Sequence, residues 1–232
     1  MIAWNDIDTV LLDMDGTLLD LAFDNWFWQQ VVPQKYAETK GIPDDQAHRL
    51  IKEWIDRHQG TLNWYCLDFW SAELGLDIAG LKREVGDRVC YRPGAEAFLQ
   101  ALRNSGRQIV MVTNAHPDAL AVKKTHTGLE QYFDQLITSH ELGSAKESAP
   151  FWEALQGRLP FDRQRSILVD DSLPVLQAGH DYGVGHLWSI LHPDSTLPPR
   201  PHTNPFPAID QFAHVTPGLV MPTAASARAH NE

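Results

Sequence analysis

The sequence contains few cysteines and no long apolar run. Cys66 and Cys90 are the two cysteines among 232 residues, and both stand beside apolar or aromatic residues. Two cysteines cannot supply the several disulfides that hold small secreted domains together, so we expect two buried thiols. No apolar run approaches the ~20 residues that a membrane-spanning helix needs. The sequence therefore predicts a protein without a membrane partner.

Basic residues are also scarce. The 19 Lys and Arg are outnumbered by 30 Asp and Glu, which leaves a formal net charge of −11. Binding along a nucleic-acid backbone needs clustered Lys and Arg, so we expect no nucleic-acid partner. A small anionic substrate is compatible with this charge, because a bound cation and a few local basic groups can outweigh the overall field. The composition carries no information on oligomeric state.

The first residues, MIAWNDIDTVLLDMDG, include acids but no basic segment. A secretory signal peptide begins with positive charge, so we expect none here and predict a cytoplasmic location. With 43% hydrophobic and 21% charged residues, the chain has the composition of an ordinary globular protein. Its length suits one domain, or a core domain that carries a smaller insertion.

Short apolar runs alternate with helical patterns over most of the chain. The apolar runs predict strands at 9–12, 108–112, 135–138, 166–169 and 185–190. The helical patterns predict helices at 93–104, 117–126, 151–156 and 174–182. Gly106 is expected to cap the first of these helices. Strands that alternate with helices predict an α/β fold with a Rossmann-like, doubly wound parallel sheet.

Residues 21–91 interrupt this alternation. They contain no strand pattern, and apolar residues recur at helical spacing, as at Ala47, Ile51 and Trp54. Five of the eight tryptophans fall in this stretch, which indicates an apolar core of its own. We therefore predict a core made of residues 1–20 and 92–215, an inserted helical cap over 21–91, and a disordered tail over 216–232.

The segment Asp13-Met14-Asp15-Gly16-Thr17 directly follows the first predicted strand. In an open parallel sheet, ligands bind beyond the carboxyl ends of the strands, which is where these aspartates stand. One carboxylate can attack phosphorus and form an aspartyl phosphate. The other can give a proton to the leaving group and later take one from water. An Asp-rich turn closing a strand is the alternative, but DxDGT after an apolar run favours a catalytic pair, Asp13 and Asp15.

Three further polar residues follow the next two predicted strands. Thr113 and Asn114 come at the end of QIVMV, where a hydroxyl and backbone N–H groups at a helix start can hold phosphate. A helix cap would use the same residues. Lys146 follows the loop after 135–138 and can neutralise a phosphoryl oxygen. An isolated lysine is more often a surface residue, so this prediction depends on the other motifs.

Asp170 and Asp171 end the run SILV. Paired acids at a strand's carboxyl end can hold a hard cation through oxygen, so Mg²⁺ is the expected cofactor. An acidic helix cap is the alternative. However, all four polar clusters end a predicted strand or begin the loop after it, and parallel strands present those ends at one edge. The four clusters are therefore expected to converge on one site.

These motifs resemble those of the haloacid dehalogenase superfamily of phosphotransferases. The matching stretches are DMDGT at 13–17, VTN at 112–114, Lys146 and LVDDS at 168–172. The resemblance covers nearly the whole chain up to about residue 190. It implies a Rossmann-like core with a helical cap inserted after the first motif. The second aspartate argues against a dehalogenase, since dehalogenases of this family typically lack it.

The resemblance also implies a role for each motif residue. Asp13 would be the nucleophile and Asp15 the acid/base, while Thr113 and Lys146 would bind phosphate. Mg²⁺ would be held by Asp13, by the backbone carbonyl of Asp15 and by Asp171, with Asp170 bound directly or through water. Glu147 departs from the family pattern, because many relatives have proline after the lysine.

A closer resemblance concerns the substrate. VLLDMDGTLLDLAFDNWFW, TLNWYCLDFW and TNAHP are similar to the bacterial GMP/IMP-type 5′-nucleotidase branch of the superfamily. These stretches run through the predicted cap, where substrate choice resides in this family, so the resemblance implies a purine nucleoside 5′-monophosphate. Asn25, Trp28 and Tyr65 are predicted to lie over the substrate, because such pockets often have an aromatic wall.

Two other functions remain open at the level of sequence. A sugar-phosphate phosphatase or phosphomutase would share this core and a helical cap. A non-catalytic phosphate-binding protein could keep the same fold, but it would have no need of both Asp13 and Asp15. A small phosphate ester is the expected binding partner under each of these alternatives.

Overall fold

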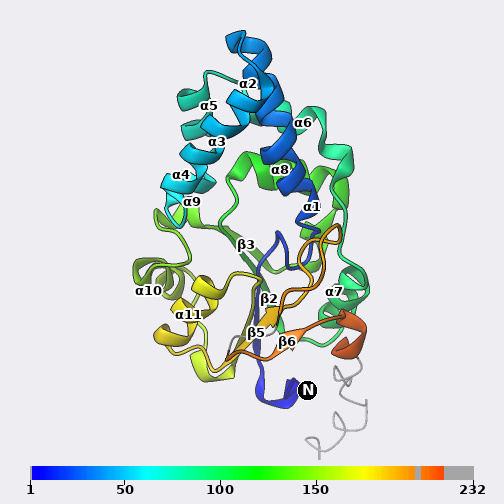
Figure 1. The fold of residues 1–232 in the computed structure, drawn as a ribbon. Coiled ribbons are helices and arrows are strands. Elements are labelled where there is room, and N and C mark those ends of the chain that lie inside the picture. The colour runs from blue at the N-terminus through cyan, green and yellow to red at the C-terminus, as the bar shows by residue number, and fades with distance from the viewer. Residues whose placement is uncertain (1, 202–204, 217–232) are drawn as a thin grey trace, which may run out of the picture.

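Six parallel strands form the centre of the computed structural model, which describes residues 2–201 and 205–216 (Figure 1). The strands are hydrogen-bonded in the order β3-β2-β1-β4-β5-β6. Their bounds are Thr9–Leu12 (β1), Gln108–Thr113 (β2), Gln135–Thr138 (β3), Ser166–Val169 (β4), His186–Ile190 (β5) and Ala208–Ile209 (β6). The predicted α/β fold with a doubly wound parallel sheet is confirmed.

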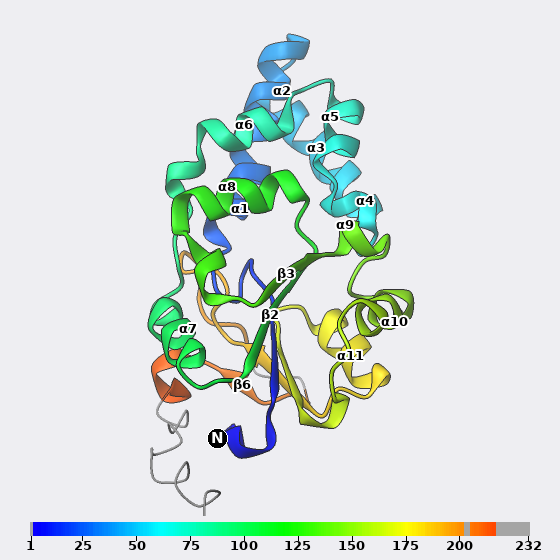
Figure 2. The same cartoon turned by 180° about the vertical axis from the view of Figure 1, so that it is seen from behind.

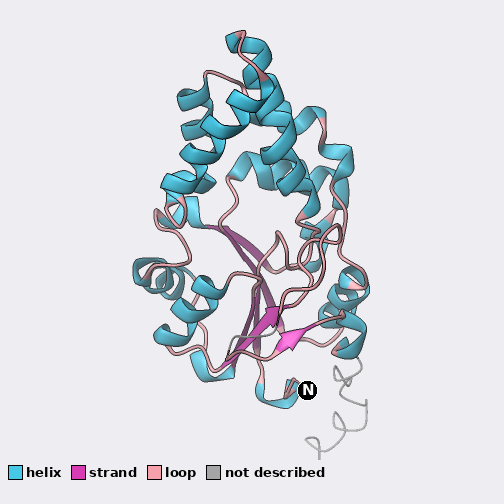
Figure 3. Ribbon diagram, viewed as in Figure 1, coloured by secondary structure: helices cyan, strands magenta, loops and turns pink. Residues whose placement is uncertain are grey.

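Helices cover both faces of the sheet (Figure 3), which explains why every residue of β1 and β4 is buried and most are apolar. Successive side chains of a strand point to opposite faces, so Val10 and Leu12 pack on one side and Leu11 on the other. The first side is covered by α7 (Ala95–Arg103) and α8 (Pro117–Thr127). The second side is covered by α10 (Ala149–Arg158) and α11 (Leu173–Tyr182).

A helical insert lies over the carboxyl ends of the strands. It holds α1 (Ala22–Trp26), a π-helical turn (Phe27–Val31), α2 (Val32–Lys40), α3 (Asp44–His58), α4 (Leu62–Tyr65), α5 (Leu67–Leu74) and α6 (Ile78–Glu84). Apolar side chains of these helices form a separate core, in which Trp70 is fully buried. Ala119 of α8 joins that core, and Figure 2 shows α8 lying against α1 and α6.

The two chain crossings between sheet and insert lie side by side. Leu19 forms an antiparallel bridge with Tyr91, and the backbone N–H of Asp20 donates to Cys90 O at 3.0 Å. The N–H of Arg92 donates to Leu18 O at 2.9 Å. Because both crossings are held together, the insert is joined to the sheet through one narrow connection.

Several local predictions need correction. Gly106 does not cap α7, whose C-cap is Asn104; Gly106, with a φ of 72°, instead turns the chain toward β2. Cys66 is half-buried, and Cys90 is exposed because it lies in the segment that crosses from the insert to the sheet rather than in either core. The short strand β6 lies in the proline-rich C-terminal segment and was not predicted. The predicted disordered tail falls, beyond residue 216, outside the described residues.

Candidate active site

Three aspartates meet at the carboxyl ends of two neighbouring strands. Asp13 follows β1, while Asp170 and Asp171 follow β4, and the pairing of Leu12 with Val169 places the two strand ends level. One carboxylate oxygen from each of the three lies within 4.8 Å of the other two. The predicted convergence of Asp13 with Asp170 and Asp171 is therefore present in the structure.

Lys146, in the loop after β3, reaches the same carboxylates. Its Nζ lies 2.7 Å from Asp13 Oδ1 and 2.7 Å from Asp170 Oδ2, and it donates to Val112 O at 3.0 Å. Burial alone would lower the pKa of Lys146, but the attraction of the two carboxylates outweighs burial and raises it. The ammonium is therefore charged, although its side chain is only 2% exposed.

The remaining negative charge is poorly compensated. Burial first, and then the repulsion of Asp13, raises the pKa of Asp171 to about 7, although Arg200 acts to lower it. Burial also raises the pKa of Asp170 well above its usual range. Three clustered carboxylates thus face one buried ammonium. A set of hard oxygen donors with excess negative charge fits a divalent cation such as Mg²⁺.

The loop after β1 packs tightly on the end of β4. Gly16 has a φ of 80°, a conformation that side chains rarely adopt. A Cβ on Gly16 would also lie 2.7 Å from Cγ of Asp171, so the position excludes any larger residue. The backbone N–H of Asp171 donates to Thr17 Oγ1 at 3.1 Å. The DxDGT segment therefore packs directly against Asp171.

Asn114, directly after β2, contacts the loop that carries Lys146. The side-chain oxygen of Asn114 accepts from the backbone N–H of Lys146 at 2.9 Å, and its amide donates to Glu147 Oε2 at 3.0 Å. Thr113 is buried, and its hydroxyl accepts from the N–H of Ala115 at 3.1 Å. In this structure Asn114 thus orients Lys146, and the phosphate contact expected from the sequence stays a prediction.

The three predicted substrate residues of the insert have different surroundings. The Tyr65 hydroxyl donates to Glu147 Oε1 at 2.5 Å, so Tyr65 links the insert to the loop that carries Lys146. Asn25 donates to Asp194 Oδ2 at 2.6 Å, in the loop after β5. Trp28 is half-buried and packs edge-on against Trp70, with 5.8 Å between ring centroids.

A chain of buried charges beside Asp15 was not predicted from the sequence. Lys123 on α8 is 1% exposed, and its Nζ lies 2.5 Å from Asp15 Oδ2 and 2.7 Å from Asp24 Oδ2. Asp24 on α1 also pairs with Lys82 on α6, at 2.6 Å. Lys123 shares a helix face with Ala119 and is thus on the buried side of α8. That spacing was the available signal, but helical lysines are usually solvent-exposed.

These buried charged groups influence the charge of Asp15. Burial raises the pKa of Asp15 to about 6, while the attraction of Lys123 acts to lower it and the repulsion of Asp24 to raise it. Burial would likewise raise the pKa of Asp24, but Lys123 and Lys82 outweigh burial and lower it. The Oδ1 atom of Asp15 is buried and has no hydrogen-bond partner among the described residues. Asp15 is thus held through one oxygen and unpaired at the other.

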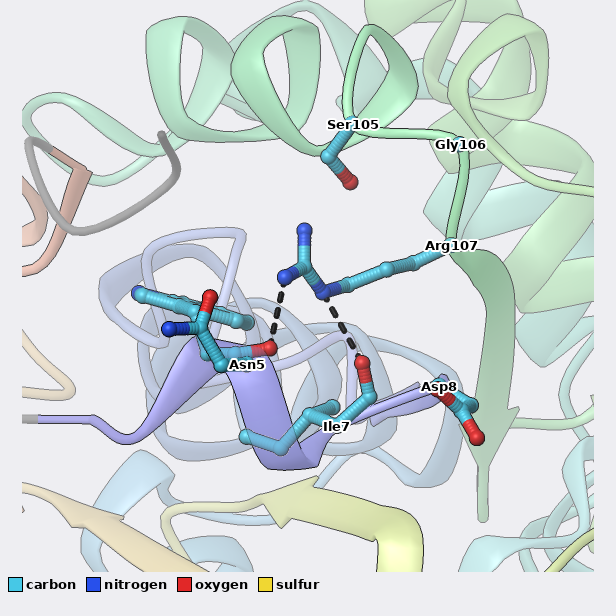
Figure 4. Close-up of a pocket in the computed structure, with 7 residues that line it drawn as sticks. Asn5, Ile7, Asp8, Ser105, Gly106 and Arg107 are labelled. Atoms are coloured by element: carbon cyan, nitrogen blue, oxygen red, sulfur yellow. Dashed lines mark hydrogen bonds between the residues drawn. The ribbon is translucent and has the colours of Figure 1, made fainter. Parts of the chain in front are cut away.

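A hollow in the described surface lies away from these carboxylates. Its volume is about 530 Å³, and it is lined by the segments that precede β1 and β2, among them Trp4, Asp8 and Arg107. Arg107 crosses it to donate to Ile7 O at 3.0 Å and Trp4 O at 2.6 Å (Figure 4). These residues precede the strands, so the hollow is at the opposite edge of the sheet from Asp13.

Comparison with known proteins agrees with this geometry. Residues 7–183 match the family model of the haloacid dehalogenase-like hydrolases. Over 219 residues the chain is 41% identical to the GMP/IMP nucleotidase YrfG of Escherichia coli strain K12, a match that covers 94% of this chain and 98% of that protein.

Solved structures show the same fold at lower identity. A HAD phosphatase from Thermococcus onnurineus is similar with a TM-score of 0.77 and 23% identity, over 92% of this chain and 98% of that one. The HAD-hydrolase YfnB of Bacillus subtilis, solved bound to magnesium, is similar with a TM-score of 0.66 and 19% identity, over 93% and 99% of the two chains.

Proposed function

We propose, from the premise that this chain belongs to the haloacid dehalogenase-like hydrolases, that it is a magnesium-dependent phosphatase of purine nucleoside 5′-monophosphates such as GMP and IMP. The observation that supports the chemistry is that Asp13 and Asp15, at one edge of the sheet, are each paired with a buried lysine, Asp13 with Lys146 and Asp15 with Lys123. The 41% identity to a GMP/IMP nucleotidase over most of both chains supports the substrate class.

In the first proposed step, a carboxylate oxygen of Asp13 attacks the phosphorus atom. The bond between phosphorus and the nucleoside oxygen breaks, and Asp15 gives its proton to that oxygen. A proton donor must be protonated before the step, and a pKa of about 6 leaves a fraction of Asp15 protonated near neutral pH. The unpaired Oδ1 of Asp15 is available for this proton, since Lys123 engages Oδ2.

In the second step, water attacks the phosphorus of the aspartyl phosphate. Asp15 takes a proton from that water, the bond between phosphorus and Asp13 breaks, and inorganic phosphate leaves. Lys146 neutralises a phosphoryl oxygen in both steps, and its ammonium is already charged and fixed beside Asp13. Asn114 contributes by holding the backbone of Lys146 in place.

Asp13, the backbone carbonyl of Asp15, and Asp171 are the proposed ligands of Mg²⁺, with Asp170 bound directly or through water. The clustered carboxylate oxygens and the raised pKa of Asp171 fit this assignment. When bound, the cation supplies positive charge to the carboxylates and to the phosphoryl group.

We also propose that Asn25, Trp28 and Tyr65 select the substrate. Tyr65 supports this proposal most directly, because its hydroxyl reaches Glu147 beside Lys146 and thus lies next to the phosphate site. Trp28 is half-buried, so part of its ring is free to contact a base. Asn25 lies one residue after Asp24, which the buried charges connect to Asp15.

A turnover screen tests the proposed function. Phosphate release is measured for purine and pyrimidine 5′-monophosphates and for sugar phosphates, each with Mg²⁺ and with excess chelator. We expect GMP and IMP to give the highest kcat/KM, and we expect no turnover in chelator. Preference for a sugar phosphate would overturn the substrate class, and full activity in chelator would overturn the dependence on magnesium.

A further inference from the structure

Three metal-binding side chains meet between the insert and the sheet. Cys66 lies between α4 and α5, His116 precedes α8, and His140 lies in α9 (Ser139–Leu142), directly after β3. One ligand atom from each residue lies within 4.8 Å of the other two. We call these residues the thiol–imidazole cluster. It shares no residue with the carboxylates around Asp13, and it joins one insert residue to two residues of the core.

His140 is the least satisfied member of the cluster. Both of its ring nitrogens are buried, and neither has a hydrogen-bond partner among the described residues. A neutral imidazole has one donor and one lone pair, and buried polar atoms are ordinarily paired. Burial first, and then the charge of His116, lowers the pKa of His140 to about 4. The ring is therefore neutral near pH 7, which is the form that binds a metal.

We propose that the thiol–imidazole cluster is a zinc site, with Cys66, His116 and His140 as ligands and a water or the Asp68 carboxylate as the fourth. Thiolate and imidazole favour Zn²⁺ over Mg²⁺, which prefers oxygen. Asp68 Oδ2 lies 3.5 Å from His116 Nε2, so a carboxylate is within reach of the site. On binding, the thiol proton of Cys66 is released and its sulfur bonds to the ion.

The geometry requires only small movements. Tetrahedral zinc, with bonds of ~2.0–2.3 Å, holds its ligand atoms roughly 3.3–3.8 Å apart. The atoms of the cluster, within 4.8 Å of one another, must therefore approach by no more than ~1.5 Å. The His116 and His140 rings are already edge-to-face at 82°, with centroids 4.9 Å apart. Side-chain rotations suffice for this approach.

His116 also has a neighbour that can orient it. Its Nδ1 accepts from the backbone N–H of Asp118 at 3.3 Å, and the Asp118 carboxylate lies 3.9 Å from the same nitrogen. When Nε2 binds a metal, Nδ1 carries the proton, so it gives up the bond from the Asp118 N–H and can donate to the Asp118 carboxylate instead. Metal-binding histidines usually have such a partner. Because Cys66 belongs to the insert, a bound ion would also hold the insert against the sheet.

Cobalt titration of the full-length protein tests the site, with excess Mg²⁺ present to occupy the carboxylates. One equivalent of Co²⁺ should produce a cobalt–thiolate charge-transfer band in the near ultraviolet and the intense visible bands of tetrahedral cobalt, and Zn²⁺ should abolish both. Cys66→Ser should remove the thiolate band. Cys90→Ser is the matched control and should keep it, because Cys90 is exposed in the segment that crosses from the insert to the sheet.

A second variant protects the test against misfolding. His140→Gln keeps Cys66, so the thiolate band should persist while the affinity for Co²⁺ falls by about tenfold or more. Circular dichroism checks that each variant is folded, and if Cys66→Ser is not, the result for His140→Gln decides. Absence of a thiolate band in the wild type, its survival in Cys66→Ser, or unchanged affinity in His140→Gln would each overturn the proposal. The experiment measures binding alone, so its failure leaves the phosphatase proposal unaffected.

Discussion

Asp13 and Asp15 are two residues apart, yet each faces a different lysine. Asp13 pairs with Lys146 from the loop after β3, and Asp15 pairs with Lys123 from α8. Lys146 is shared with Asp170, whereas Lys123 is shared with Asp24 of the insert. The two carboxylates therefore have separate electrostatic surroundings, as two different chemical roles require.

Replacing each aspartate separately should produce two different losses. Asp13→Asn replaces the proposed nucleophile with a nearly isosteric amide, so we expect no detectable turnover. Asp15→Asn removes the proposed proton donor, so we expect kcat to fall ~10²–10⁴-fold. The measurement is steady-state hydrolysis, with the melting temperature as a control for folding. Near wild-type hydrolysis by Asp13→Asn would contradict the mechanism.

Asp171 predicts how the stability of the metal-free protein depends on pH. Its pKa of about 7 in the folded protein exceeds the ordinary value, so folding favours the protonated carboxyl. This contribution to stability is full at low pH and is lost as pH rises through about 7. In chelator, the melting temperature should therefore fall between pH 6 and pH 8. Mg²⁺ binds the carboxylate form, so it should restore stability more at pH 8 than at pH 6.

Asp171→Asn is the control for this prediction. An amide does not titrate in this range, so the decline in chelator should become shallower in the variant. Thermal unfolding between pH 6 and pH 8, with and without Mg²⁺, provides the measurement. If the melting temperature of the wild type in chelator stays constant or rises over this range, the charge of Asp171 is compensated in solution.

At the scale of elements, three helices meet through the buried charges beside Asp15. Asp24 lies on α1, Lys82 on α6 and Lys123 on α8. The ion pair of Asp24 with Lys82 lies within the insert, and its ion pair with Lys123 joins the insert to a core helix. A buried ion pair need not add stability, but removing one partner leaves an uncompensated charge away from water. The contact between insert and sheet is therefore sensitive to Asp24.

Asp24→Asn should lower the free energy of unfolding by roughly 3–5 kcal/mol, because it leaves the buried Lys82 without an ion-pair partner and Lys123 with Asp15 alone. Asp45→Asn is a matched control on α3. Its ion pair with Arg49 has a similar distance, 2.7 Å, but both side chains are 68% exposed. We expect the control to cost less than ~1 kcal/mol. Denaturant unfolding measures both effects. Equal effects would show that the buried charges beside Asp15 are not structurally important.

At the scale of the whole molecule, the proposed function requires that substrate reach the carboxylates between the insert and the sheet. The insert connects to the sheet through the crossings at Leu19 and Tyr91, and Tyr65 contacts Glu147 on the opposite side of the insert. This arrangement suits a motion in which the insert turns about the crossings and closes over the substrate, excluding water from the reaction.

Trp28→Ala tests whether the insert contacts the base. If the Trp28 ring packs on the purine, the substitution should cost about 1–3 kcal/mol of transition-state binding for GMP, by analogy with base stacking on aromatic residues. Hydrolysis of a small aryl phosphate should barely change. Trp54→Ala is the matched control, since Trp54 is also half-buried in the insert and packs on Tyr36. Equal loss on both substrates with a lowered melting temperature would place Trp28 in the insert core only.

Much of the fold could be predicted because it depends on local patterns. The strands β1, β3 and β4 have the predicted bounds, since strands covered on both faces are rich in apolar residues and stand out as short apolar runs. The insert followed from helical spacing and clustered tryptophans. By contrast, the two-residue strand β6 and the exposure of Cys90 depend on where the C-terminal segment and the crossings pack, which no local pattern specifies.

The sequence by itself also determined which acids gather, because Asp13, Asp170 and Asp171 each end a parallel strand and such ends meet at one edge. Only the tertiary structure decided which partners those acids have. Lys123 is 99 residues from Asp24, and Tyr65 is 82 residues from Glu147. The thiol–imidazole cluster likewise forms only when the insert rests on the sheet. Ion pairs, hydrogen bonds and metal ligands act over a few ångströms, so their partners are determined by how helices pack and not by spacing along the chain.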